Sequence, residues 1–150
     1  MNAATTVPDT IQREITIAAP VDVVWPLVSE PGWWINEGEI REHSIEAIRD
    51  NVWKVSDVKH GDWLIEVVGS VEQESVSFRW LAGESDSVQP DQLRTLVEFT
   101  LQPVDGGTLV RVVESGFAVG TIDEKRRNTY DANAEGWEIE LAAAKTHLEQ

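Results

Sequence analysis

The chain has 150 residues, of which 41% are hydrophobic, 27 are acidic and 12 are basic, so its formal net charge is −15. This length is typical of one domain, and the hydrophobic content is sufficient for a buried core. So negative a charge argues against binding to nucleic acids or to anionic membrane surfaces. In the simplest interpretation, the negative charge keeps the protein soluble. The alternative is that the acidic residues form a docking face for a basic partner. The chain has no cysteine, which excludes disulfides, thiolate metal sites and a cysteine nucleophile.

The ends of the chain carry no sign of a membrane segment or a signal peptide. No apolar stretch approaches the roughly 20 residues needed to cross a bilayer, so no membrane span is expected. Residues 1–10 lack the basic and apolar regions of a signal peptide. We expect them to form a flexible tail before a single domain at residues 11–150, in a cytoplasmic protein.

The first predicted elements are a strand and a short helix. Ile11, Ile15 and Ile17 alternate with polar residues, which is typical of a strand buried on one face. Pro20 suits the first position of a helix. One face of that helix would be apolar, at Val21, Val24, Trp25 and Val28. Pro26 inside it predicts a short or kinked helix. Pro31 and Gly32 then break the chain before a second short helix or turn at residues 33–35.

Residues 39–117 are predicted to form strands joined by short turns. Apolar and polar residues alternate with a period of two, and the turns are too short for helical crossovers, which indicates an antiparallel meander. Gly106 and Gly107 indicate a hairpin. The inner faces are expected to carry Trp63, Ile65, Val76, Phe78, Trp80, Val97, Phe99, Leu101, Val110 and Val112.

A long helix is predicted to close the chain. Thr121 and Glu124 form a capping-box pattern at its start. Side chains recur at steps of three or four on one mostly apolar face: Ile122, Arg126, Tyr130, Ala134, Trp137, Leu141, Ala144 and Leu148. Gly136 is expected to allow close approach between this helix and the sheet.

Four motifs in this order resemble a known family. They are Ile15-x-Ile17-x-Ala-Pro20 with Trp25, Gly107-Thr108-x-Val110, Glu114-x-Gly116-Phe117, and Gly136-Trp137. The chain is similar to the C-terminal domain of the heat-shock-protein-90 ATPase activator, in the START-like helix-grip superfamily. The resemblance implies an α+β fold of order β-α-α-β6-α: a curved antiparallel sheet of six to seven strands, two short helices, and a long C-terminal helix over a cavity.

Glu114 is the polar residue that the pattern singles out. It shares the strand face of Val110 and Val112, so its carboxyl group is predicted to point inward. A buried carboxylate needs partners, because leaving one unpaired costs several kcal/mol. It would either be held by a salt bridge or hydrogen bonds to the closing helix, or anchor one end of a ligand.

The predicted function is the binding of a hydrophobic or aromatic small molecule between the sheet and the closing helix. The expected lining combines large apolar side chains with one polar group. It consists of Trp63, Ile65, Phe78, Trp80, Phe99, Val112, Glu114, Tyr130, Trp137 and Leu141. The alternatives are a polyketide cyclase or aromatase acting around Glu114 or Tyr130, and an interaction module for a chaperone or stress-response partner.

No catalytic residue, cofactor or metal is predicted. The three histidines, His43, His60 and His147, lack the spacing of metal ligands, although His60 lies close in sequence to Asp57 and Asp62. A monomer is expected.

Overall fold

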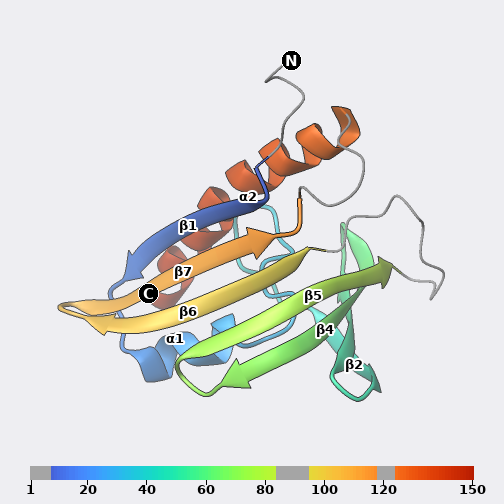
Figure 1. The fold of residues 1–150 in the computed structure, drawn as a ribbon. Helices are drawn as coiled ribbons and strands as arrows, with labels where there is room; N and C mark the ends of the chain where they lie inside the picture. Colours follow the sequence, from blue (N-terminus) through green and yellow to red (C-terminus); the bar gives the residue numbers. More distant parts are fainter. Residues whose placement is uncertain (1–7, 84–94, 118–123) are drawn as a thin grey trace, which may run out of the picture.

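The computed structural model describes residues 8–83, 95–117 and 124–150. Within them, seven strands and two helices follow in the order β1 (Thr10–Ile17), α1 (Val21–Val28), β2 (Ser44–Arg49), β3 (Val52–Asp57), β4 (Gly61–Val71), β5 (Ser75–Gly83), β6 (Leu96–Val104), β7 (Gly107–Ser115) and α2 (Glu124–Leu148). The strands form one antiparallel sheet of order β1-β7-β6-β5-β4-β3-β2, so the first strand pairs with the last and the others form a meander (Figure 1).

The sheet and helices have the arrangement of a helix-grip fold. The long helix α2 lies along β1 and the adjacent part of the sheet, while α1 lies near the β6–β7 end (Figure 1). The predicted fold class is therefore confirmed, with seven strands. One detail differs: residues 31–34 form turns, so α1 is the one short helix among the described residues.

Helix α1 is short, as the proline inside it predicted. Pro20 occupies the N-cap position, one residue before the first helical residue, with φ −71° and ψ 162°. Pro26 lies inside the helix and has no N–H to donate. The helix ends two residues later, at Val28, and Ser29 caps it by donating its backbone N–H and its hydroxyl to the carbonyl oxygen of Trp25.

Glycine is required where strands β1 and β7 come together. The two-residue loop Asp105–Gly106 joins β6 to β7, which confirms the predicted hairpin. A Cβ atom on Gly107 would lie 1.9 Å from the carbonyl oxygen of Ile17. No larger residue fits there unless the two strands separate.

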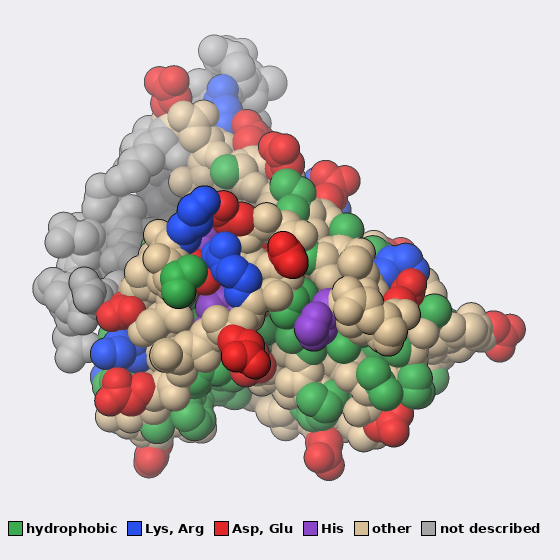
Figure 2. Space-filling view, turned by 180° about the vertical axis from the view of Figure 1, so that it is seen from behind, with side chains coloured by type: hydrophobic (Ala, Val, Ile, Leu, Met, Phe, Trp, Pro, Cys, Tyr) green, Lys and Arg blue, Asp and Glu red, His purple; other side chains and the backbone are tan. Residues whose placement is uncertain are grey.

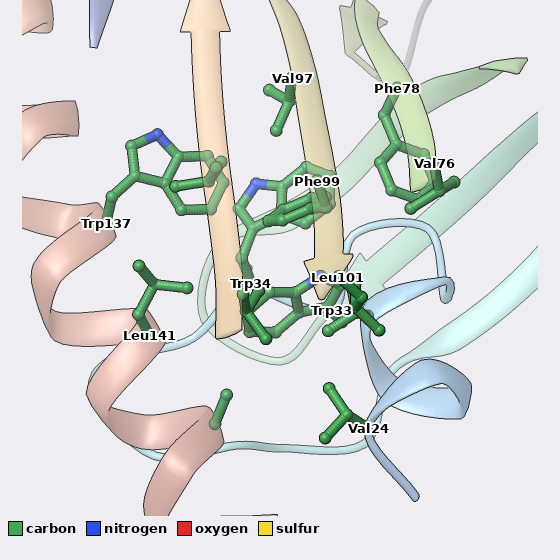
Figure 3. Close-up of a cluster of buried hydrophobic side chains, with 14 of the residues drawn as sticks. Val24, Trp33, Trp34, Val76, Phe78, Val97, Phe99, Leu101, Trp137 and Leu141 are labelled. Atoms are coloured by element: carbon green, nitrogen blue, oxygen red, sulfur yellow. The ribbon is translucent and has the colours of Figure 1, made fainter. Parts of the chain in front are cut away.

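The core lies between the sheet, α2 and the turns after α1. Trp33 and Trp34 lie among Phe78, Phe99 and Trp137 in Figure 3. Trp33 is fully buried and its ring centroid lies 5.5 Å from that of Phe99. The predicted inner-face residues of β5, β6 and β7 are in this core: Val76, Phe78, Val97, Phe99, Leu101, Val110 and Val112 are buried.

Helix α2 faces the sheet with the side chains that its sequence period predicted. Trp137, Leu141 and Ala144 are buried and Leu148 is partly buried. Thr121 and Ile122, part of the predicted start of this helix, lie outside the described residues, as does the side chain of Arg126. Across the described part of the chain, neither helix is long and apolar enough to pass through a bilayer.

Candidate functional site

A pocket of about 160 Å³ lies between the sheet and helix α2. The turns after α1 contribute one wall, β5 and β7 the floor, and α2 the opposite wall. Its lining residues are Trp34, Asn36, Trp80, Glu114, Ala132, Asn133, Gly136, Trp137 and Glu140. On α2 the lining positions 132, 136 and 140 follow one another at steps of four, and 133, 137 and 140 at steps of four and three, so all five share one helical face.

Glu114 lies at the polar end of this pocket and is 1% exposed. Its carboxylate accepts hydrogen bonds from the Thr95 hydroxyl, from Trp137 Nε1 at 2.8 Å and from Asn133 Nδ2 at 3.2 Å. Trp80 also donates to it. Burial raises the pKa of Glu114 above its ordinary value, and the donors from Thr95, Trp137, Asn133 and Trp80 offset only part of that effect. The predicted inward orientation is correct, and its partners are hydrogen-bond donors.

Three tryptophan rings form the apolar walls. The ring centroid of Trp34 lies 5.6 Å from those of both Trp80 and Trp137, at interplanar angles of 88° and 48°. The hydrogen bonds from Trp80 and Trp137 to Glu114 hold the N–H edges of these two rings at the carboxylate. The indole N–H of Trp34 is buried and has no acceptor within the described residues. Glu114 therefore fixes the orientation of two of the three rings that line the pocket, those of Trp80 and Trp137.

A second carboxylate, that of Glu140, lies on the same pocket. It is 7% exposed and accepts hydrogen bonds from Asn36 Nδ2 at 3.1 Å and from the backbone N–H of Gly38 at 3.0 Å. These contacts attach the turns after α1 to helix α2. No ion pair of Glu114 or Glu140 with a cation occurs in the described part of the chain.

Gly136 lies on the pocket wall for a different reason from the one predicted. A Cβ atom there would meet nothing within 4 Å, so the residue is not needed for close approach of the helix to the sheet. A methyl group at this position would instead occupy pocket space.

Some of the predicted site residues line the pocket, some lie in the core, and two, Trp63 and Tyr130, lie elsewhere. Trp80, Glu114 and Trp137 line the pocket. The others in the core are Ile65, Phe78, Phe99, Val112 and Leu141, all at most 2% exposed. Trp63 is half-buried beside Trp80, with ring centroids 5.4 Å apart. Tyr130 is apart from the pocket, because its hydroxyl donates to the carbonyl oxygen of Thr10 and its ring packs on Phe117.

Sequence reasoning missed Trp34, Asn36, Asn133 and Glu140 as pocket residues. The sequence pattern could have identified Asn133 and Glu140, because they lie one turn before and one turn after Trp137 on the same face of the predicted helix. Trp34 and Asn36 lie in turns, where the sequence has no helical or strand periodicity from which the direction of a side chain could be predicted.

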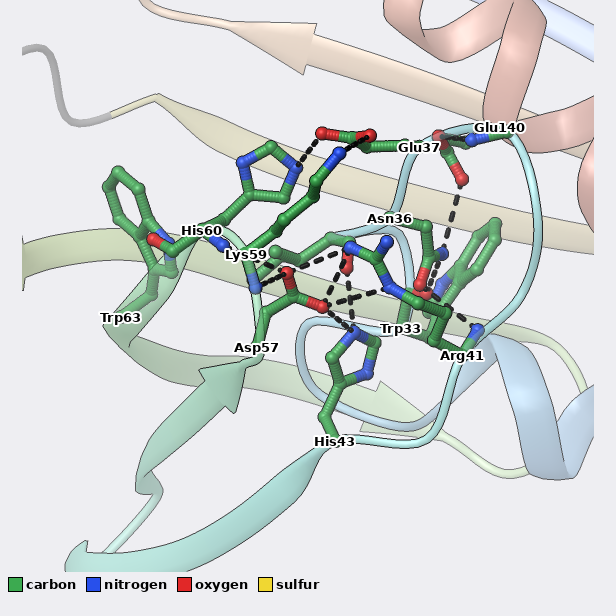
Figure 4. A network of polar contacts seen from close by, with 12 residues as sticks. Trp33, Asn36, Glu37, Arg41, His43, Asp57, Lys59, His60, Trp63 and Glu140 are labelled. Carbon is green, nitrogen blue, oxygen red and sulfur yellow. Dashed lines mark hydrogen bonds and ion pairs between the residues drawn. The ribbon is translucent and has the colours of Figure 1, made fainter.

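Next to the pocket but outside its lining, Asp57 organises a network of polar contacts (Figure 4). Arg41 donates to both of its carboxylate oxygens, at 2.9 and 2.8 Å, and the backbone N–H groups of Lys59 and His60 donate at 3.0 and 2.9 Å. Burial acts to raise the pKa of Asp57, but these two amides and Arg41 outweigh it, so the pKa is lowered. His43 Nε2 lies 3.3 Å from the same carboxylate.

His60 does not approach Asp57 with its ring. Its Nε2 lies 3.5 Å from the carboxylate of Glu37 near the surface, while its backbone N–H faces Asp57. Asp57 is thus engaged in holding the β3–β4 turn and Arg41 in place, which is a structural role.

Residues 18–149 match the family model described as activator of Hsp90 ATPase homolog 1-like protein. The chain belongs to this family. The resemblance stated from the motifs is therefore confirmed over nearly the whole chain. No curated protein matches it.

Solved structures share the fold at low sequence identity. Protein MLL2253 from Mesorhizobium loti is 23% identical with a TM-score of 0.68, covering 93% of this chain and 96% of that one. DynU16, a protein in the dynemicin biosynthetic locus, is 21% identical with a TM-score of 0.67, covering 96% of this chain and 48% of that one. The Aha1 dimer from Colwellia psychrerythraea is 17% identical with a TM-score of 0.66, covering 93% and 96%. At such identities the likeness shows the fold alone.

On the face of the molecule seen in Figure 2, the acidic side chains do not gather in one patch. In Figure 2, acidic side chains are distributed around the visible face, with basic side chains between them. This face supports the solubility interpretation of the charge better than a single acidic docking patch.

Proposed function

We propose that the protein binds a small molecule in the pocket between the sheet and helix α2. The observation that carries this proposal is the lining itself, which joins three aromatic walls to two buried carboxylates in one concavity. Ligand sites typically have this composition of mostly apolar walls and a few convergent polar groups. The indole N–H of Trp34, for which the described residues provide no acceptor, adds a buried donor that an oxygen atom on a ligand would satisfy.

The size of the pocket limits the ligand. Core side chains fill most of the space between sheet and helix, and about 160 Å³ is left. A cavity of about 150 Å³ accepts benzene. The pocket therefore suits a molecule of one ring, or one end of a larger molecule, and is too small to enclose a polycyclic compound. Burial of so little surface, set against the cost of association, predicts weak affinity, of the order of micromolar to millimolar.

Gly136→Ala tests this proposal without disrupting the fold. Alanine in place of glycine inside a helix stabilises it by about 0.5–1 kcal/mol, and the new methyl group meets no atom within 4 Å. The same methyl group reduces the pocket. We expect the variant to melt at a higher temperature than the natural protein and to bind small one-ring compounds more weakly, as followed by tryptophan fluorescence during titration.

Gly69→Ala is the matched control, because a Cβ there also meets nothing within 4 Å and Gly69 lies on β4, outside the pocket lining. It should leave ligand titrations unchanged. Equal binding by Gly136→Ala and the natural protein would contradict the proposed site.

A second candidate function is that of a cyclase or aromatase-type enzyme. Its support is the raised pKa of Glu114, since a buried carboxyl group with a perturbed pKa at a pocket is a candidate general acid or base. Tyr130, the other residue considered for that role, does not line the pocket. The similarity of fold to DynU16 is compatible with this function. Turnover of an aromatic polyketide-like compound that is abolished in Glu114→Gln would establish it.

Three broader expectations accompany the proposal. A role with a chaperone or stress-response partner rests on the family membership alone, and ranks below the other two functions. A monomer and a cytoplasmic location remain predictions. Light scattering coupled to size-exclusion chromatography would test the first of these, since the similar Aha1 structure is that of a dimer.

A further inference from the structure

We propose that the ligand of this pocket is a small organic cation, such as an amine or a quaternary ammonium compound. The inference rests on the proposed binding function and names the chemical class of its ligand. It comes from the combination of two buried carboxylates with three tryptophan faces in one pocket of about 160 Å³.

Glu114 and Glu140 are 1% and 7% exposed, and both line the pocket. Their partners within the described residues are hydroxyl, amide and indole donors, none of which carries a formal charge. Two buried carboxylates line one concavity, and each was removed from water at considerable cost. A cationic group in the pocket would be attracted by both, whereas an anionic ligand would be repelled.

The faces of tryptophan rings attract cations within about 6 Å of the ring centroid, more strongly than those of phenylalanine or tyrosine. The ring centroid of Trp34 lies 5.6 Å from those of both Trp80 and Trp137, and all three residues line the pocket. Trp80 and Trp137 each donate an N–H to the carboxylate of Glu114, which draws electron density toward the ring and strengthens its attraction for a cation.

Neutral and anionic ligands suit this pocket less well than cations. A neutral one-ring molecule would fit the volume and the walls but would bring no positive charge to the two hydrogen-bonded carboxylates. A fatty acid or benzoate would bring a third carboxylate toward Glu114 and Glu140. The overall charge of −15 acts in the same direction, because it raises the local concentration of cations around the molecule.

Matched probes of different charge and similar shape test this assignment by titration calorimetry of the full chain. One set is choline and its neutral analogue 3,3-dimethylbutan-1-ol; the other is benzylammonium, benzyl alcohol and benzoate. The buffer must be sodium phosphate with about 0.15 M salt, which screens exposed charges. Tris is unsuitable because it is itself an organic cation. We expect each cation to bind at least about tenfold more tightly than its neutral analogue, and benzoate not to bind.

Two variants locate the effect. Glu140→Gln keeps the shape of the side chain and removes one charge, and should reduce the preference for the cation over the neutral analogue by about tenfold. Glu138→Gln removes an exposed carboxylate from the same helix, outside the pocket lining, and should leave that preference intact. If Glu140→Gln does not fold, the comparison of charged and neutral probes on the natural protein decides alone.

The possible failures are distinguishable. If the alcohols or benzoate bind as tightly as the cations, the assignment of a cationic ligand is wrong while the binding function stands. If no probe of any charge binds to the natural protein, both the cationic ligand and the proposed binding function are overturned. An equal loss of preference in Glu138→Gln and Glu140→Gln would also refute the assignment, because it would show a general field effect.

Discussion

Replacement of Trp137 measures how strongly helix α2 is held on the sheet. Its side chain is 4% exposed, its ring centroid lies 5.6 Å from those of Phe99 and Trp34, and its Nε1 donates to Glu114 at 2.8 Å. Truncation of a buried aromatic residue to alanine costs about 3–5 kcal/mol. The lost hydrogen bond to a charged group adds about 1.5 kcal/mol or more. We expect Trp137→Ala to lose about 5 kcal/mol, which is a large part of the stability of a typical domain, about 5–15 kcal/mol.

Urea unfolding followed by far-ultraviolet circular dichroism measures this change without depending on tryptophan emission. Trp137→Phe separates the two contributions, because it keeps most of the ring contacts and loses the N–H, and should cost about 2 kcal/mol. Ile139→Ala, at a position 45% exposed on the same helix, is the control and should change stability by less than about 0.5 kcal/mol. The reasoning is refuted if Trp137→Ala costs less than about 1.5 kcal/mol, or if Phe and Ala at this position cost the same.

The structure also predicts how substitutions of Gly107 and Asp57 change the stability of the fold. Gly107→Ala places a Cβ atom 1.9 Å from the carbonyl oxygen of Ile17. The variant should therefore be less stable by about 3 kcal/mol or more, as measured by thermal melting. An unchanged melting temperature would contradict the close approach of β1 and β7. The pKa of Asp57 is lowered in the folded protein, so its contribution is present above the unfolded-state pKa and is lost as pH falls through the folded value. Asp57→Asn should therefore lower the free energy of unfolding by about 3 kcal/mol at pH 7, and by less in acid. A loss of the same size at neutral and acidic pH would show that the charge of the carboxylate does not stabilise the fold.

The inward orientation of Glu114 shows what a strand pattern predicts about a site. Side chains on a strand alternate between faces, so the phase of Val110 and Val112 was enough to place Glu114 among buried residues. The same logic on α2 placed Trp137 and Leu141 against the sheet. It did not place Tyr130 correctly relative to the pocket, because a helix about 25 residues long extends past the site and its ends meet other neighbours.

The hydrophobic periodicity and short motifs of the sequence were enough to predict the order of elements, the buried faces of the strands and of α2, and the family. Each of these features depends on residues that lie close together along the chain. Only the tertiary structure decided the site. Trp34 and Asn36 lie in turns without a period, and their contacts with Trp80, Trp137 and Glu140 join residues 46 to 104 positions apart. The volume left between these side chains depends on how they interlock, so the size of the predicted cavity, about 160 Å³, is a property of packing that no local pattern carries.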